Sequence, residues 1–257
     1  MLSYIKISSV EKTLCSFCSR PIKSQALVDL SIETKPKLIC FRCFNNKFIW
    51  CHNCNSQELK EKACTDSFIK EYTFCPTLQY YGQKTNRDLM IGFELEVEAP
   101  DNDDIYLTAK KLQCAMDVIF IKRDGSIGHG FEIVSHPMTP SFIKHYDWSE
   151  LFKLSRIEYR SFNTESCGLH LHLSRAAFGK LHLLKFMYFF YNPDNRSFLS
   201  RLSRRDLGKL KQWSSLESYG STPRKGLTKD VRRIHNSVGK YTAVNNSHKD
   251  SIEIRMF

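Results

Sequence analysis

Paired cysteines near the N-terminal end are the feature that most constrains this chain. Eight of its ten cysteines lie before residue 76, and six of these form three Cys-x2-Cys pairs. Met1 to Val10 lacks the basic start and apolar stretch of a secretory signal, so we expect a cytoplasmic protein whose thiols stay reduced. Because two thiolates at this spacing fit a tetrahedral ion, the pairs predict zinc rather than disulfides.

The first two pairs predict one zinc site. Residues 22–39 between the pairs are rich in strand-forming side chains and hold Pro36, as a hairpin would, and aromatic residues after the second pair favour a helix start. This order of knuckle, hairpin and helix is typical of a treble clef or zinc ribbon. The ligands predicted for this first zinc ion are Cys15, Cys18, Cys40 and Cys43.

A second zinc site needs ligands from the remaining N-terminal cysteines. Cys51 and Cys54 form the third pair, and Cys64 with Cys75 is the obvious completion. A cross-braced pairing of the two sites is an open alternative, and buried or redox cysteines are the competing interpretation. Zinc would be structural here, since it replaces the core that a small lobe lacks.

A larger domain follows the cysteines. The chain has 42% hydrophobic and 12% aromatic residues, enough to bury a core. No apolar run reaches the roughly 20 residues that a membrane helix needs. The polar stretch after Cys75 divides the chain into a cysteine-rich zinc-binding domain at 1–85 and a second domain at 86–257. The net charge of +11 is compatible with nucleic acid, ATP or acidic partners without choosing among them.

Four candidate strands of the second domain share one polar face. Residues 90–98 alternate strictly between glutamate and apolar side chains, and residues 168–174 alternate between histidine and leucine. Residues 130–135 and 251–257 follow the same pattern. The polar positions are Glu94, Glu96, Glu98, Glu132, His170, His172, Glu253 and Arg255. Glutamates and imidazoles gathered on a concave face suit divalent cations, and Mg²⁺ shares its coordination shell with phosphate oxygens.

Each motif alone has a simpler interpretation. Alternating glutamates are typical of a solvated sheet face, and histidines on a strand are more often core or surface residues than ligands. The segment Lys122-Arg-Asp-Gly-Ser126 is first of all a hairpin turn. All of these motifs together, in one order along the chain, indicate a particular function much more specifically than any single motif does.

In that order the motifs resemble the amidoligase family, which belongs with the carboxylate–amine ligases of the glutamine synthetase and glutamate–cysteine ligase fold. The resemblance covers roughly residues 90–257, about two thirds of the chain, and excludes the cysteine-rich segment. It rests on Gly92-Phe-Glu-Leu-Glu96, Lys122-x-Asp-Gly-Ser126, Gly130-Phe-Glu-Ile-Val-Ser135, Cys167-Gly-Leu-His-Leu-His-Leu-Ser174, Tyr241-x-x-Val-Asn245 and Glu253-Ile-Arg-Met-Phe257.

The resemblance implies an α+β fold in which a curved antiparallel sheet forms a trough with helices on its outer face. The magnesium ligands that it implies are Glu94, Glu96, Glu253 and His170. The implied catalytic residues are Glu132, Arg255, His170 and Asp124. The implied cofactor-binding residues are Lys122, Arg255, His172 and Asn245.

The implied function is an ATP- and Mg²⁺-dependent ligase that joins a carboxylate to an amine through an acyl phosphate, with a small molecule, a peptide or a protein as acceptor. Two departures from the family pattern weaken the expected activity, namely the end of the chain at Phe257, directly after the last motif, and Lys240 in place of arginine. One alternative is an inert ligase-like scaffold whose zinc lobe binds nucleic acid or a protein partner, and another is a metallohydrolase. Relatives of this kind are common in phage genomes, which extends the expected location to the cytoplasm of a host.

Overall fold

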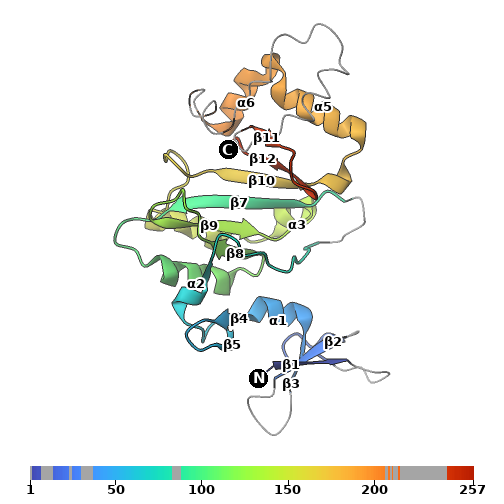
Figure 1. Cartoon of the computed structure of the whole chain (residues 1–257), viewed down its shortest axis with the longest axis vertical. Coiled ribbons are helices and arrows are strands. Elements are labelled where there is room, and N and C mark those ends of the chain that lie inside the picture. Colours follow the sequence, from blue (N-terminus) through green and yellow to red (C-terminus); the bar gives the residue numbers. More distant parts are fainter. Residues whose placement is uncertain are drawn as a thin grey trace.

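The computed structural model describes residues 2–6, 14–22, 25–29, 37–82, 88–205, 208, 210, 214 and 242–257. Over these residues the chain has an α+β fold with a cysteine-rich N-terminal segment, which confirms the predicted class (Figure 1). None of the helices in these ranges is long and apolar enough to cross a membrane.

Within the described ranges, the main sheet has seven strands, in the order β11-β12-β10-β7-β9-β8-β6. Their bounds are β6 Ile69–Lys70, β7 Ile91–Glu98, β8 Ile119–Lys122, β9 Gly130–Ser135, β10 Leu169–Ser174, β11 Val244–Asn245 and β12 Ser251–Ile254. Neighbouring strands are antiparallel except β6, which pairs with β8 in parallel. The prediction of a wholly antiparallel sheet is therefore wrong at this edge. The reason is that β6 comes from the cysteine-rich segment and reaches β8 through a long crossover.

Alternation along the strands gives the sheet one polar and one apolar face. On β7, Val97 is buried in the apolar core, and Glu96 beside it points to the opposite face. The register carries this pattern across the sheet, because Glu94 lies opposite His170 on β10 and Glu96 lies opposite Glu132 on β9. Polar positions that are far apart in the sequence thereby become neighbours.

Helices pack against the apolar face in two places. On α2, Leu112 is buried in one cluster with Phe131 of β9, and on α6, Leu199 is buried in a second cluster with Ile252 of β12. Asp104 caps α2 by accepting two backbone N–H hydrogen bonds. The helices are α1 Phe41–Lys47, α2 Ile105–Ala115, α3 Pro140–His145, α4 Ser149–Phe152, α5 Lys180–Tyr191 and α6 Arg196–Ser203. The 3-10 turns are η1 Thr65–Ser67, η2 Lys153–Ile157, η3 Arg175–Ala177 and η4 Pro193–Asn195.

The cysteine-rich segment contains the predicted knuckle, hairpin and helix start. A bridge between Leu14 and Pro21 closes the knuckle around the first cysteine pair. A three-stranded antiparallel sheet and a hairpin complete the segment, and α1 begins directly after β3. The strands are β1 Leu2–Lys6, β2 Gln25–Asp29, β3 Lys37–Cys40, β4 Phe48–Cys51 and β5 Ser56–Leu59.

The later part of the cysteine-rich segment packs into the core of the main sheet. Phe68 is fully buried there, and Gln113 of α2 donates to the Phe68 carbonyl at 2.6 Å. Lys110 Nζ donates to the carbonyl of Ala63, also at 2.6 Å. The predicted division of the chain near residue 85 stays a prediction, but the shared core already includes Ile49.

Candidate metal centres and active site

One group of possible metal ligands spans three neighbouring strands. The ligand atoms of Glu94 on β7, His170 on β10 and Glu253 on β12 lie within 4.8 Å of one another. His170 Nδ1 is 3.4 Å from Glu94 Oε2 and 3.6 Å from Glu253 Oε1. All three side chains were predicted from the sequence, and β10 brings them together because it lies between β7 and β12. One imidazole and two carboxylates can hold a divalent cation.

His172, predicted to bind the cofactor, lies beside this group. Its Nε2 is 3.2 Å from Glu94 Oε1, and its Nδ1 is 3.3 Å from Ser251 Oγ. Burial opposes protonation of His172, but the Glu94 carboxylate outweighs burial and raises the pKa of the imidazole. Burial likewise disfavours the charged form of Glu94, but hydrogen bonds from His170 and His172 hold the pKa of that carboxyl well below its usual range. Glu94 is therefore ionised at neutral pH.

Glu253 is almost completely buried and is surrounded by donors. Asn245 Nδ2 donates to Glu253 Oε2 at 2.9 Å, His248 Nε2 lies 3.1 Å from the same oxygen, and Arg255 pairs with Oε1. Burial alone would raise the pKa of Glu253, but Arg255 and the nearby imidazoles lower it. The sequence did not single out His248, because it lies in the turn between β11 and β12 and outside every motif. Asn245, predicted to bind the cofactor, holds Glu253 in place.

A second group of possible ligands lies beside the first. Oxygen atoms of Glu96, Asp124 and Glu132 lie within 4.8 Å of one another. Asp124, predicted to be catalytic, follows β8, and Ser126 donates to its Oδ1 from both N–H and Oγ, at 2.7 and 2.6 Å. Carboxylates this close repel one another unless a proton or a cation lies between them. The four magnesium ligands predicted together are thus divided between two groups, with Glu96 in the second.

Burial and the charge of Glu94 in the first group change the titration of the second group. Burial, followed by the charge of Glu94, raises the pKa of Glu132 to about 8. Burial also raises the pKa of Glu96. Lys122, predicted to bind the cofactor, lies opposite Glu132 on β8, and its positive charge offsets part of the rise in the pKa of that carboxyl. A carboxyl with a pKa near 8 can take a proton from an amine near neutral pH or release its own proton to an incoming cation.

An arginine that the sequence did not single out lies against the second group. Arg205 follows α6, and its Nη2 donates to the Cys167 carbonyl at 2.9 Å. A Cβ placed on Gly168 would lie 2.7 Å from Arg205 Nη2 and 3.6 Å from Glu96 Oε2, so the ends of both side chains lie close to this glycine. In the sequence, Arg205 belongs to a basic stretch with helical spacing, and such a stretch is typical of a solvated helix face rather than of a binding site.

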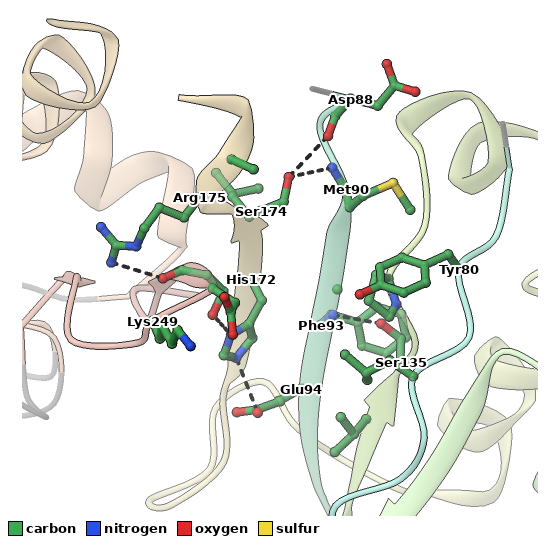
Figure 2. A pocket seen from close by; sticks show the side chains of 18 of the residues that line it. Tyr80, Asp88, Met90, Phe93, Glu94, Ser135, His172, Ser174, Arg175 and Lys249 are labelled. Carbon is green, nitrogen blue, oxygen red and sulfur yellow. Dashed lines mark hydrogen bonds and ion pairs between the residues drawn. The ribbon is translucent and has the colours of Figure 1, made fainter. Parts of the chain in front are cut away.

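A cavity of about 740 Å³ lies beside Glu94 and His172. Figure 2 shows these two side chains meeting between β7 and β10, with Lys249 on the side of β10 and Tyr80 on the side of β7. Apolar lining residues include Leu78, Met90, Phe93, Phe120, Val134 and Pro137. An apolar cavity that ends at a group of charged possible metal ligands has the composition of a small-molecule site.

The first four cysteines form the predicted group, and their thiols lie within 4.8 Å of one another. The N–H of Cys40 donates to Cys15 Sγ at 3.3 Å, and the N–H of Cys43 donates to Cys40 Sγ at 3.5 Å. Burial raises the pKa of Cys15, but backbone N–H donors, that of Cys40 foremost, outweigh burial and bring it to about 6. The arrangement of Cys15, Cys18, Cys40 and Cys43 is compatible with zinc.

The second cysteine group has three members rather than the four predicted. Cys51, Cys54 and Cys64 lie within 4.8 Å of one another. The N–H of Cys64 donates to Cys51 Sγ at 3.5 Å and is the main reason that the pKa of Cys51 falls to about 6. Cys75 is exposed and lies outside the group, because β6 carries the chain away to the edge of the main sheet before Cys75 is reached.

Neither a scan against models of protein families nor searches of curated proteins and solved structures found a match to this chain. The resemblance to the amidoligase family therefore stays a prediction. Two positions of the sequence argument, Lys240 and Tyr241, lie outside the described residues. The functional hypothesis rests on the two groups of carboxylates and histidine on the sheet.

Proposed function

We propose that the protein is an ATP- and Mg²⁺-dependent ligase, of the glutamine synthetase type, that joins a carboxylate to an amine. The observation that carries the proposal is the presence of two adjacent groups of possible metal ligands on one sheet face, centred on Glu94 and Glu96 of β7. Amide formation from an acid is uphill, so the acid must first be activated, and an acyl phosphate is the simplest activated form that ATP provides. Phosphoryl transfer from ATP needs divalent cations and positive side chains around the moving charge.

The ligand atoms of the two groups suit magnesium or manganese. Five of the six side chains are carboxylates, and His170 is the one imidazole. Hard cations prefer oxygen ligands, and Mg²⁺ is usually held by a few carboxylates together with substrate phosphates. Bound ions and ATP would supply the charge neutralisation and the leaving group that activation of the acid requires. The raised pKa of Glu132 supports this assignment, because a cation would replace the proton that now relieves the repulsion.

Positive side chains border both groups. Arg255 is paired with Glu253, and its Nε is buried without a hydrogen-bond partner among the described atoms. Arg205 lies by Glu96, and Lys122 lies opposite Glu132. Guanidinium groups bind phosphate and carboxylate oxygens in pairs, so Arg255 and Arg205 are suited to hold the anionic parts of the substrates.

Glu132 is the proposed base. An amine substrate is largely protonated at neutral pH and must lose a proton before it attacks an activated acid. The pKa of Glu132 is about 8 in the metal-free protein, and its carboxylate could accept this proton where a bound cation leaves one of its oxygens free. An activated acid hydrolyses unless water is excluded, and the apolar lining of the cavity beside Glu94 would favour that exclusion once substrates fill it.

The test is calorimetry of ATP binding to the full chain, with and without Mg²⁺. We expect binding that requires Mg²⁺ and that is lost in Glu94→Gln and in Glu96→Gln. Glu98→Gln is the matched control, since Glu98 lies on the same face of β7 outside both groups and should leave binding unchanged. ATP binding that ignores the first two variants, or no binding by the wild type, would overturn the proposal. Salt-dependent nucleic-acid binding in its place would favour the scaffold alternative.

A further inference from the structure

The two cysteine groups share one backbone arrangement. In the first group, Cys40 is the N-cap of α1, and its N–H donates to Cys15 Sγ at 3.3 Å. In the second group, Cys64 is the N-cap of η1, and its N–H donates to Cys51 Sγ at 3.5 Å. In both groups, therefore, the first cysteine of a Cys-x2-Cys pair accepts a hydrogen bond from the cysteine that starts a helical turn.

The match extends to the second cysteine of each pair. Cys18 Sγ lies 3.8 Å from Cys40 Sγ, and Cys54 Sγ lies 4.0 Å from Cys64 Sγ. These sulfur–sulfur separations are those of thiols that share one tetrahedral metal ion. Three positions of the first group thus have counterparts of the same residue type in the second.

The fourth position differs between the two groups. Cys43 is the third residue of α1, and Ser67 is the third residue of η1, so each lies three positions after its N-cap. Ser67 is fully buried, and its Oγ accepts a hydrogen bond from the N–H of His52 at 3.2 Å. The Ser67 hydroxyl also lies beside the Cys51 side chain. Ser67 therefore stands where a fourth thiolate would complete the second group.

We propose that Cys51, Cys54 and Cys64 bind a second zinc ion whose fourth coordination position lies beside Ser67 Oγ and accepts an exchangeable ligand. Zinc sites with four thiolates are closed and structural, whereas zinc sites with three protein ligands keep a position for water or another small ligand. A neutral hydroxyl is a weaker zinc ligand than a thiolate, so the ion is held less firmly here than in the first group. Cys54 is exposed, which gives solvent a path to the ion.

The first experiment follows zinc release from the full chain to a coloured chelator. The wild type should carry two zinc ions and release them in two phases, with the fast phase coming from the second group. Ser67→Cys should abolish the fast phase. Cys43→Ser is the matched converse, because it gives the first group the same three-thiolate composition, and it should convert the slow phase to a fast one. Cys75→Ala should release zinc like the wild type.

Cobalt substitution gives an independent measure, because the charge-transfer absorbance of bound Co²⁺ increases with the number of thiolate ligands. The absorbance of the wild type should correspond to seven thiolate ligands, four from the first group and three from the second. The absorbance of Ser67→Cys should correspond to one more thiolate ligand. The proposal is overturned by one zinc ion per wild-type chain or by a single release phase in the wild type. The loss of a thiolate ligand in Cys75→Ala would overturn it too, since Cys75 would then be the fourth ligand.

Discussion

Glu96 and Glu132 lie directly opposite each other on the antiparallel strands β7 and β9, and both side chains are buried. Like charges at such a position destabilise a sheet. Asp124 adds a third carboxylate within 4.8 Å, although Lys122 provides some compensation. In the metal-free state the sheet face therefore loses stability as these carboxyl groups become ionised.

Without added divalent cations, we expect the contribution of Glu132 to the free energy of unfolding to fall as pH rises from about 4.5 to about 8. The pKa of Glu132 is about 8 in the folded protein against 4.5 for the free side chain. The folded state therefore binds more protons in this window, and each pKa unit corresponds to about 1.4 kcal/mol. Glu132→Gln should remove this slope and stabilise the protein at pH 8, which urea unfolding at a series of pH values measures.

Addition of Mg²⁺ or Mn²⁺ at pH 8 provides the control for Glu132. The cation should restore stability to the wild type, because it takes over the role of the proton, and it should have a smaller effect on Glu132→Gln. If the wild type and the variant keep a constant difference in stability over the whole window, the carboxylate cluster does not titrate as described.

His136 should make the protein sensitive to acid. It is buried against Tyr81 and Phe120, and burial lowers the pKa of its imidazole to about 4 from 6.5. The unfolded state then binds more protons between these values, so His136 costs about 2 kcal/mol of stability as pH falls from 7 to 5. In His136→Phe this loss should disappear, and an NMR titration showing a pKa near 6.5 for His136 would contradict the prediction.

Gly130 should be far less tolerant of alanine than Gly128, two residues away. A Cβ on Gly130 would lie 2.0 Å from the carbonyl oxygen of Val97, whereas a Cβ on Gly128 meets no atom within 4 Å. Because the obstacle is backbone, strands β7 and β9 must move apart, and we expect Gly130→Ala to cost more than about 2 kcal/mol, against about 0.5 kcal/mol or less for Gly128→Ala. Equal midpoints of chemical unfolding for the two variants would show that the strands approach less closely.

Phe68 should stabilise the main sheet, although it lies among the clustered cysteines in sequence. Its side chain is fully buried in the core shared with α2 and β8, so Phe68→Ala should cost about 3–5 kcal/mol. Phe152→Ala is the control, because Phe152 is 68% exposed. The measurement is the midpoint of chemical unfolding, followed by the near-ultraviolet circular dichroism of the aromatic residues in the main sheet. An unchanged midpoint for Phe68→Ala would mean that the cysteine-rich segment unfolds independently of the sheet.

Local patterns in the sequence were sufficient to predict much of the candidate site. Alternation along residues 90–98 and 168–174 placed Glu94 and His170 on polar strand faces, and the spacing of the first cysteines predicted their grouping. These predictions succeed because the direction of a side chain on a strand and the bite of a Cys-x2-Cys pair depend on a few consecutive residues.

The tertiary structure decided which of these residues meet. Strand order and register divide the carboxylates between two groups. The packing of α6 brings Arg205 close to Glu96, and the turn between β11 and β12 places His248 beside Glu253. The parallel pairing of β6 with β8 carries Cys75 away from the other thiols and leaves Ser67 in the fourth place. Such contacts join residues far apart along the chain, and they are set by how the apolar faces of sheet and helices bury one another. No local spacing encodes that burial, so the sequence determined which chemical groups are available and the packing determined their partners.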